Sequence, residues 1–368
     1  MPRAAVLYEA GQPLRVEEVD LAPPQTREVR VRVVAAGVCH SDYHYMKGDL
    51  ATRLPAVLGH EGAGVVEEVG AGVTTVAPGD HVVLLWRSGC GHCAYCATGR
   101  PALCAHGAAL RNTGRLLDGT TRLSRDGREI SHFLGVSCFA EAAVCPEQSV
   151  LKIDGDIPLE IAALAGCSVM TGVGAATNSA RVEPGSSVLV IGAGGVGLCA
   201  IMGAQLCGAA RVVAADLNPS KLRMAHEFGA SDLIDASSED VVKAVRELTG
   251  GGVDFAFEAI GRPETVTQAL RALRAGGVAV AIGVAPPAAR AEISPFDLVL
   301  QEKTLKGSIY GSTRPHADFP RLFELYRRGR LPLDRLLSRR YRLEEVNEAY
   351  DAMLTGEVAR SVITFPAS

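Results

Sequence analysis

SVLVIGAGGVGLCA, residues 187–200, joins a short apolar strand to a glycine-rich turn and the start of an apolar helix. The turn fits the pattern G-x-G-x-x-G, in which glycines let the backbone bend tightly and approach a pyrophosphate at the N-terminus of the helix. The motif alone is weak because glycine is abundant here, but the strand before it and the helix after it make it strong. The turn residues expected to contact a dinucleotide are Gly192, Gly194, Gly195, Val196 and Gly197.

A carboxylate, Asp216, ends the next strand-like run, RVVAAD, and lies 216 − 197 = 19 residues after the last glycine of the motif. At this position a carboxylate accepts hydrogen bonds from both hydroxyl groups of the adenosine ribose, and it repels the 2′-phosphate of NADP. The sequence therefore predicts NAD as the cofactor. Lys221 is a second candidate for the same ribose, with a solvated surface lysine as the alternative.

Strands and helical segments alternate from about residue 160 to residue 311, an order typical of a doubly wound parallel sheet. Before them, runs such as EVRVRVVAAGV (28–38) read as short strands between Gly, Pro and Asp turns. After them come two amphipathic helical stretches and a closing strand, SVITF. We therefore predict an α/β protein with a β-rich domain at residues 1–168 and 312–368 and a doubly wound domain at residues 169–311.

Composition argues against several classes of protein. The chain has 368 residues, a net charge of −4 and an isoelectric point near 6.2, so no basic surface for nucleic acid is expected. The N-terminus has no apolar signal core, and the ten cysteines then read as thiols and metal ligands of a cytoplasmic protein rather than as disulfides. Glycines interrupt the uncharged stretch 185–210, which predicts a buried strand and helix rather than a membrane span.

Four cysteines lie within the run GCGHCAYCATGRPALC (89–104). Their spacing, C-x2-C-x2-C-x7-C, allows four thiolates to surround one tetrahedral ion, and zinc is the usual ion of an all-sulfur structural site. Because such a site is coordinatively closed, we expect it to stabilise a lobe rather than to catalyse a reaction. Its ligands are Cys90, Cys93, Cys96 and Cys104.

Three more residues with zinc-ligand chemistry lie outside this cluster: Cys39 in GVCHSDYH, His60 in GHEGAG and Cys167 in AGCSVMTG. A Cys2His set with a fourth position open to water or substrate is a known catalytic zinc shell, in which the metal acts as a Lewis acid. Each residue alone is more often a small buried thiol or a hydrogen-bonded histidine. Spacing does not show that the three converge, since 167 − 60 = 107 residues separate the last two.

Together these motifs resemble those of the zinc-dependent medium-chain alcohol dehydrogenases, and the resemblance covers nearly the whole chain. The three ligand segments, the four-cysteine lobe, GAGGVG, VAAD and the closing ARSVITF stand in that family's order with close spacing. The resemblance implies a GroES-like β-rich catalytic domain, a Rossmann domain and an active site in the cleft between them. It further implies two zinc ions and NAD as cofactors, a small alcohol or aldehyde as substrate, and a long-lobed bacterial member similar to classes I and III.

The resemblance assigns the catalytic zinc to Cys39, His60 and Cys167. Asp42 and Glu61 are similar to the acids behind these ligands, with Asp42 orienting His60. Ser41 resembles the hydroxyl that contacts the alcohol oxygen, and His44 the base that ends a proton relay through Ser41 and the nicotinamide ribose. Cofactor contacts are implied for His40, Thr171, Val196, Arg262 and Arg360.

More detailed expectations concern two cofactor-binding residues and the substrate pocket. Arg360 resembles an arginine that binds the pyrophosphate, whereas His40 stands where many members have arginine, which predicts faster release of NADH. Trp86 resembles a pocket wall beside the zinc and would favour primary over secondary alcohols, with simple core packing as the alternative. The implied pocket is apolar, which predicts longer aliphatic or aromatic alcohols, and comprises Leu50, Trp86, Ala109, Leu134 and Ile309.

Other functions remain open at this point. A thiol-dependent formaldehyde dehydrogenase shares the scaffold; neutral residues near Leu50 and Ala108 disfavour glutathione but not mycothiol. A zinc-ribbon binding module and a non-catalytic protein that binds NAD and zinc are further alternatives. The length of segment 105–133 and the strand-like 304–311 resemble dimeric members, so a homodimer is expected by analogy.

Overall fold

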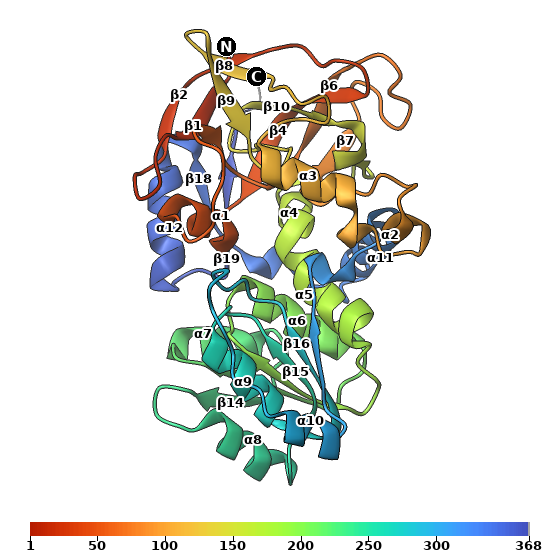
Figure 1. The fold of residues 1–368 in the computed structure, drawn as a ribbon, viewed down its shortest axis with the longest axis vertical. Coiled ribbons are helices and arrows are strands. Elements are labelled where there is room, and N and C mark those ends of the chain that lie inside the picture. Colours follow the sequence, from red (N-terminus) through yellow and green to blue (C-terminus); the bar gives the residue numbers. More distant parts are fainter. Residues whose placement is uncertain (367–368) are drawn as a thin grey trace. The chain divides into compact units, whose positions relative to one another are not determined.

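The computed structural model describes residues 1–366, which form two compact units (Figure 1). Unit 1 comprises Met1–Cys167 together with the chain from Arg314 onward, and unit 2 comprises Ser168–Thr313. These boundaries lie one and two residues from those predicted. Unit 1 is rich in strands, and unit 2 alternates strands with helices, so the predicted α/β fold class is confirmed.

Unit 2 is built on one six-stranded sheet in which every pair of neighbouring strands is parallel. Its spatial order is β14-β13-β12-β15-β16-β17. Numbered along the chain, this is the order 3-2-1-4-5-6 of a Rossmann fold. The strands are β12 (Ser187–Ile191), β13 (Arg211–Asp216), β14 (Asp232–Asp235), β15 (Val253–Glu258), β16 (Leu273–Ala281) and β17 (Thr304–Gly307).

The helices of unit 2 pack against this sheet. α6 (Gly195–Leu206) is uncharged and mostly buried, which explains the uncharged stretch of sequence as a core strand followed by a core helix. The other helices are α5 (Met170–Gly174), α7 (Pro219–Glu227), α8 (Val241–Thr249), α9 (Pro263–Arg271) and α10 (Pro295–Leu300), with a π-helical segment η4 (Ala175–Ala180) and a 3-10 turn η5 (Tyr310–Ser312).

One continuous helical run in the described chain, Leu159–Ala180, is long and apolar enough to cross a membrane by length and composition. Within its apolar window, 89% of the residues are buried inside the fold. Core helices pass the same test, and this degree of burial favours a core helix.

Unit 1 contains two sheets. The first has the order β2-β1-β5-β9-β8-β3, and the second has the order β11-β7-β6-β4-β19-β18 with β10 paired to β4. The strands are β1 (Arg3–Leu7), β2 (Arg15–Glu18), β3 (Asp20–Leu21), β4 (Glu28–Gly37), β5 (Ala56–Val57), β6 (Glu61–Val69), β7 (His81–Leu84), β8 (Leu123–Arg125), β9 (Arg128–His132), β10 (Ala142–Pro146), β11 (Val150–Lys152), β18 (Leu337–Arg342) and β19 (Arg360–Thr364).

The N-terminal region also contains helices, although the sequence pattern predicted only short strands there. α1 (His40–Lys47) follows β4 directly and ends at Gly48, whose φ of 89° suits a left-handed helix cap. The remaining helical elements of unit 1 are α2 (Ala94–Ala97), α3 (Ala105–Thr113), α4 (Leu159–Leu164), α11 (Pro315–Arg327) and α12 (Val346–Thr355), and the 3-10 turns η1 (Pro101–Leu103), η2 (Glu147–Ser149), η6 (Leu333–Leu336) and η7 (Leu343–Glu345). The π-helical turn η3 (Ala165–Val169) follows α4 and continues into unit 2 after Cys167.

Candidate active site

The three predicted catalytic ligands converge inside unit 1. Cys39 is 4% exposed, His60 1% and Cys167 6%. One ligand atom of each, together with a carboxylate oxygen of Glu61, lies within 4.8 Å of all the others. The convergence that the sequence spacing left open is therefore present in the fold.

Pairing between two long strands positions the first two ligands. β4 and β6 are antiparallel with Gly37 opposite Glu61, so the end of β4 lies beside the start of β6. Cys39 follows β4 as the N-cap of α1, and His60 immediately precedes β6. Gly37 has to be a glycine, because a Cβ there would lie 2.1 Å from the Glu61 carboxylate.

Cys167 reaches the same place from a π-helical turn. η3 continues directly from α4, and an extra residue in a helical turn changes the direction in which its side chains point. Gly166, beside it, is also constrained, because a Cβ there would lie 3.3 Å from Val83 on β7 and 3.4 Å from the carbonyl oxygen of Leu84. The third ligand thus depends on close packing of this turn against the β-sheet.

Asp42 fixes the orientation of His60. Its Oδ1 accepts a hydrogen bond of 2.9 Å from Nδ1 of His60, and the Asp42 side chain is fully buried. Because a metal-bound histidine commonly donates its other ring nitrogen to a carboxylate, this contact leaves Nε2 of His60 free to bind a metal. Burial raises the pKa of Asp42, and the neighbouring His60 only partly opposes the shift.

Glu61 forms a buried ion pair with Arg360, the first residue of β19. Burial raises the pKa of Glu61 to about 8, against the opposing positive charge of Arg360. The second carboxylate oxygen, Oε1, makes no hydrogen bond within the described chain. A carboxylate that has one oxygen held by an arginine and the other unpaired suits a position beside a cation.

Arg360 therefore has a contact that the sequence did not predict. It is 6% exposed, and the ion-pair partner that the structure gives it is Glu61 of its own unit. Its expected contact with the cofactor pyrophosphate stays a prediction.

The donor set fits zinc. Two cysteine sulfurs and a histidine with a hydrogen-bonded outer nitrogen are the ligands of a catalytic Cys2His zinc site. A hydrogen bond from Cys167 lowers the pKa of Cys39 well below its usual value, and the nearby His60 and Arg360 shift it in the same direction. The Cys39 sulfur is thus favoured as the thiolate that a metal requires.

Ser41 and His44 lie on α1, directly after the first ligand, and both are half-buried. Three residues apart on a helix, their side chains are neighbours on one face. His44 Nδ1 lies 3.1 Å from Oδ2 of Asp49, which also pairs with Lys47 at 3.7 Å. Asp49 is a partner that the sequence analysis missed, because a contact five residues away across a helix end has no distinct sequence signal.

Aromatic side chains enclose His60. The Trp86 ring stands edge-on to the imidazole with ring centroids 5.8 Å apart, and the Phe133 ring lies at 6.1 Å. Trp86 also packs against the hydrophobic core of unit 1, and its role as a wall of the substrate pocket stays a prediction. Phe133 was not predicted, although it directly precedes Leu134, which is itself buried.

The other predicted pocket residues are spread over both units. Leu50 packs against the core of unit 1, and Ile309 belongs to unit 2. Ala109 is exposed on α3. It lines a cavity of about 530 Å³ whose remaining lining residues are Arg53, Leu110, Thr113, Arg115, Leu116, Leu117 and Gly119. Among these residues, Trp86 lies next to a predicted zinc ligand through its ring contact with His60.

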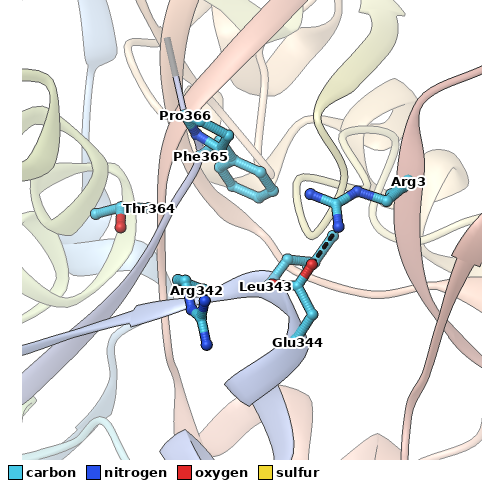
Figure 2. Close-up of a pocket in the computed structure, with 7 residues that line it drawn as sticks. All are labelled: Arg3, Arg342, Leu343, Glu344, Thr364, Phe365 and Pro366. Atoms are coloured by element: carbon cyan, nitrogen blue, oxygen red, sulfur yellow. Dashed lines mark hydrogen bonds and ion pairs between the residues drawn. The ribbon is translucent and has the colours of Figure 1, made fainter. Parts of the chain in front are cut away.

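A further cavity of unit 1, of about 270 Å³, lies at the C-terminal end of β19 (Figure 2). The guanidinium of Arg3 points at the carboxylate of Glu344 there, and Arg3 also pairs with Glu141. None of the predicted site residues lines this cavity. Its other lining residues are Arg342, Leu343, Thr364, Phe365 and Pro366.

The four cysteines of the lobe also come together. All four sulfurs lie within 4.8 Å of one another, and Cys104 is buried while the other three are half-exposed. Backbone N–H groups of Cys90 and Cys93 donate to the sulfurs of Cys104 and Cys90, each at 3.3 Å. A hydrogen bond from the backbone of Cys96 lowers the pKa of Cys93 to about 6. These N–H donors stabilise thiolates, as a closed structural zinc site requires.

In unit 2 the glycine-rich turn leads from β12 into α6. A Cβ on Gly197 would lie 1.8 Å from the carbonyl oxygen of Gly192, and Gly192 has a φ of 96°. A Cβ on Gly194 would meet nothing within 4 Å, so space is open at the N-terminus of α6. The free N–H groups of a helix N-terminus beside open space suit a pyrophosphate.

Asp216 lies beside this turn, at the C-terminal end of β13. Its Oδ2 accepts 2.8 Å from the backbone N–H of Ala193, and its Oδ1 accepts 2.9 Å from that of Asn218. The two bonds fix the carboxylate next to the glycine-rich turn.

The remaining predicted cofactor residues are on both units. Thr171 is buried in α5, Lys221 is half-buried in α7, and Arg262 is the exposed N-cap of α9. His40 is exposed at the first position of α1, with its ring 5.1 Å from that of His44.

Comparison with known proteins identifies the family. The model of the alcohol dehydrogenase GroES-like domain matches residues 25–155, and the model of the zinc-binding dehydrogenase domain matches residues 195–328. The chain belongs to the zinc-dependent medium-chain alcohol dehydrogenase family, as the sequence resemblance predicted. It is therefore a zinc-dependent oxidoreductase of that family.

Solved structures of similar proteins match this chain over its full length. An alcohol dehydrogenase zinc-binding domain protein from Burkholderia ambifaria is 40% identical, with a TM-score of 0.95 over 100% of this chain and 99% of that one. The benzyl alcohol dehydrogenase of Acinetobacter calcoaceticus is 36% identical, with a TM-score of 0.94 over 99% of each chain. A zinc-binding dehydrogenase from Sinorhizobium meliloti, solved with NADP bound, is 29% identical, with a TM-score of 0.80 over 99% of each chain.

Proposed function

We propose that this protein oxidises primary alcohols, aliphatic or aromatic, with NAD, and reduces the matching aldehydes. The observation that carries the proposal is the buried Cys2His set in which Asp42 holds His60 and leaves Nε2 available. Bound there, zinc would supply the Lewis acid that acidifies the alcohol, and the nicotinamide would accept the hydride.

Ser41 and His44 are the residues that we propose to move the proton of the alcohol. Both follow the ligand Cys39 on one face of α1, and both are half-buried. The Ser41 hydroxyl would accept the proton while passing its own toward His44, and His44, held by Asp49, would release a proton to water. Ser41→Ala should lower kcat by about 10²–10⁴-fold, whereas Ser41→Thr should retain most of the rate because it keeps the hydroxyl. A Ser41→Ala enzyme with full turnover would remove Ser41 from the scheme.

NAD rather than NADP is proposed on the position of Asp216. One structurally similar protein binds NADP, so the preference needs support from this chain. The carboxylate is fixed beside the glycine-rich turn at the end of β13, where a negative charge repels a 2′-phosphate. In the ratio of kcat/KM for NAD to that for NADP, wild type should favour NAD and Asp216→Gly should lose most of that preference. Equal use of both cofactors by wild type would contradict the proposal.

The preference for primary and benzylic alcohols is proposed on the aromatic surroundings of His60. Trp86 and Phe133 both stand near the imidazole, so bulk next to the reacting carbon is disfavoured and a flat ring has apolar partners. A benzyl alcohol dehydrogenase is among the similar structures. Trp86→Ala should raise kcat/KM for 2-butanol relative to benzyl alcohol.

The deciding experiment is NADH formation by the purified enzyme across ethanol, hexanol, benzyl alcohol, 2-butanol, and formaldehyde with and without glutathione or mycothiol. Zinc should be counted on the same sample. Turnover of primary or benzylic alcohols with two zinc ions per chain is the expected result. Activity only with formaldehyde plus a thiol would replace the proposal by a thiol-dependent formaldehyde dehydrogenase, and two zinc ions without turnover on any substrate would overturn catalysis.

We also propose that two copies of the chain associate through the edge of the unit 2 sheet. β17 is the edge strand, and the short helix α10 shortly before it exposes Phe296 by 70%, Val299 by 73% and Leu300 by 66%. Contiguous exposed apolar side chains near an open sheet edge are typical of a protein interface. Sedimentation should show a homodimer, and Val299→Asp should shift it toward monomer. A wild-type monomer at micromolar concentration would contradict this proposal.

A further inference from the structure

Two histidines lie beside the four-cysteine lobe and have no role in the proposed function. His92 stands between Cys90 and Cys93, and His106 follows Cys104 by two residues. His92 precedes α2, and His106 lies in the first turn of α3. Both imidazoles are exposed, so an ion from solvent can reach them without any opening of the fold.

The fold of the lobe brings these two histidines together with one sulfur. The Sγ of Cys90 and one ring nitrogen from each histidine lie within 4.8 Å of one another. The two imidazoles meet edge-on, with centroids 5.2 Å apart at 72°. Ligand atoms around a tetrahedral zinc ion are roughly 3.3–3.8 Å apart, given bond lengths of about 2.0–2.3 Å. Small rotations of two exposed side chains therefore suffice to close a three-ligand set.

A hydrogen bond prepares His92 for this role. Its Nδ1 lies 2.8 Å from the carbonyl oxygen of Cys90. A carbonyl can only accept, so Nδ1 carries the proton and the neutral ring has its lone pair on Nε2. A ring nitrogen bonded to a backbone carbonyl while the other nitrogen is unprotonated is the usual arrangement of a metal-binding histidine.

Charge also favours a cation on this face. Four thiolates around one zinc ion carry a net charge of about −2. A coordinated thiolate keeps lone pairs that can bond a second ion, and three of the four cysteines here are half-exposed rather than buried. One of these three is Cys90, the sulfur next to both histidines.

We propose that His92, His106 and Cys90 form an additional metal site, in which Cys90 bridges the structural zinc and a second divalent transition ion. Two imidazoles and one thiolate suit borderline ions such as Zn²⁺, Co²⁺, Ni²⁺ and Cu²⁺ rather than Mg²⁺ or Ca²⁺. The site rests on the structural zinc of the proposed function, because the folded lobe holds the two histidines together.

The test is a titration of the zinc-loaded full-length enzyme with Co²⁺, with binding followed by calorimetry and by visible and near-ultraviolet absorption. One further ion should bind beyond the two zinc ions, with sulfur-to-cobalt charge-transfer absorption, while the zinc count stays unchanged. His106→Ala and His92→Ala should each weaken this binding by more than about tenfold, since loss of a ligand exceeds the effect of losing an outer contact. His316→Ala, an exposed histidine on α11, is the matched control and should bind cobalt as wild type does.

The site would be overturned by the absence of an additional ion, by an additional ion unaffected by both histidine substitutions, or by an additional ion without the sulfur band. Release of zinc in step with cobalt uptake would also overturn it, because cobalt would then have replaced zinc. A lobe that holds no zinc before the titration would overturn both this site and the structural zinc. Loss of alcohol turnover alone would bear only on the catalytic proposal.

Discussion

The buried site and the cysteine lobe use the same ligand chemistry in opposite settings. Cys39, His60 and Cys167 are at most 6% exposed and come from three separate segments of unit 1. The four cysteines of the lobe lie within 15 consecutive residues, and three of them are half-exposed. One site depends on the whole β-rich unit, and the other depends on one loop.

The surroundings of the two sites differ as much as their assembly. Ionisable side chains stand behind the buried ligands: Asp42 bonds His60, and Glu61 pairs with Arg360. In the lobe, backbone N–H groups donate to the sulfurs. A closed site needs only stable thiolates, whereas a reactive site also needs a fixed histidine and control of charge around an open position.

His60→Ala would break the buried site and should have the largest effect on turnover. A Lewis-acid metal contributes several kcal/mol to the transition state, so kcat/KM for benzyl alcohol should fall by roughly 10³-fold or more. The zinc content should fall from two ions per chain to one, with the remaining ion in the lobe. Full turnover with a single zinc ion would show that a metal in the buried site is not required for catalysis.

Asp42→Asn tests the contribution of the contact between Asp42 and His60 without changing any of the predicted zinc ligands. The amide oxygen can still accept from Nδ1 of His60, but the negative charge is lost, and such changes lower zinc affinity by about 10–100-fold. Zinc release to a chelator should therefore become faster in one of its two phases, while the phase from the lobe is unchanged. Asp126→Asn, on an exposed turn, is the control, and equal release from it and Asp42→Asn would contradict the role of Asp42.

Cys96→Ala should act on stability rather than on chemistry. A loss of about 3 kcal/mol, a small part of the binding free energy of a structural zinc, would lower Tm by roughly 6–12 °C. The turnover per folded molecule should change far less than in His60→Ala. Cys207→Ala removes a half-buried cysteine outside both ligand sets and should leave the zinc content unchanged. A Cys96→Ala enzyme with two zinc ions would contradict the assignment of the lobe.

The features that could be predicted from the sequence are those formed by residues close together in the chain. The four cysteines, the glycine-rich turn and Asp216 lie within local motifs, and the structure places each beside its expected neighbours. The Rossmann sheet followed from alternation of strands and helices and is confirmed by its strand order. Local patterns specify these features because the residues that form them lie near one another in the sequence.

Contacts between distant segments could not be predicted in the same way. Gly37 faces Glu61 because β4 and β6 pair, and Arg360 reaches Glu61 because β19 adds to the same sheet. Nothing within either local sequence encodes that register. The family resemblance named the three ligands, but the ion pair behind them and the Phe133 ring beside His60 emerge only from the packed fold.

Asp49→Asn should have the smallest effect, because it changes the orientation and charge around His44 without touching the ligands. The hydrogen bond from His44 lowers the pKa of Asp49, so its carboxylate is charged at neutral pH and the contact is lost only on acidification. In the variant, His44 loses its negatively charged hydrogen-bond partner and is held less firmly in the position that receives the proton. At high pH, hydroxide in solvent can take over that task. We therefore expect kcat to fall by less than about tenfold, with the larger deficit at pH 6 and little at pH 9.

Lys47→Ala removes the weaker partner of Asp49, 3.7 Å away, and should keep the wild-type pH profile. A uniform loss at all pH values in Asp49→Asn would assign Asp49 to the fold of α1 instead of to the proton path.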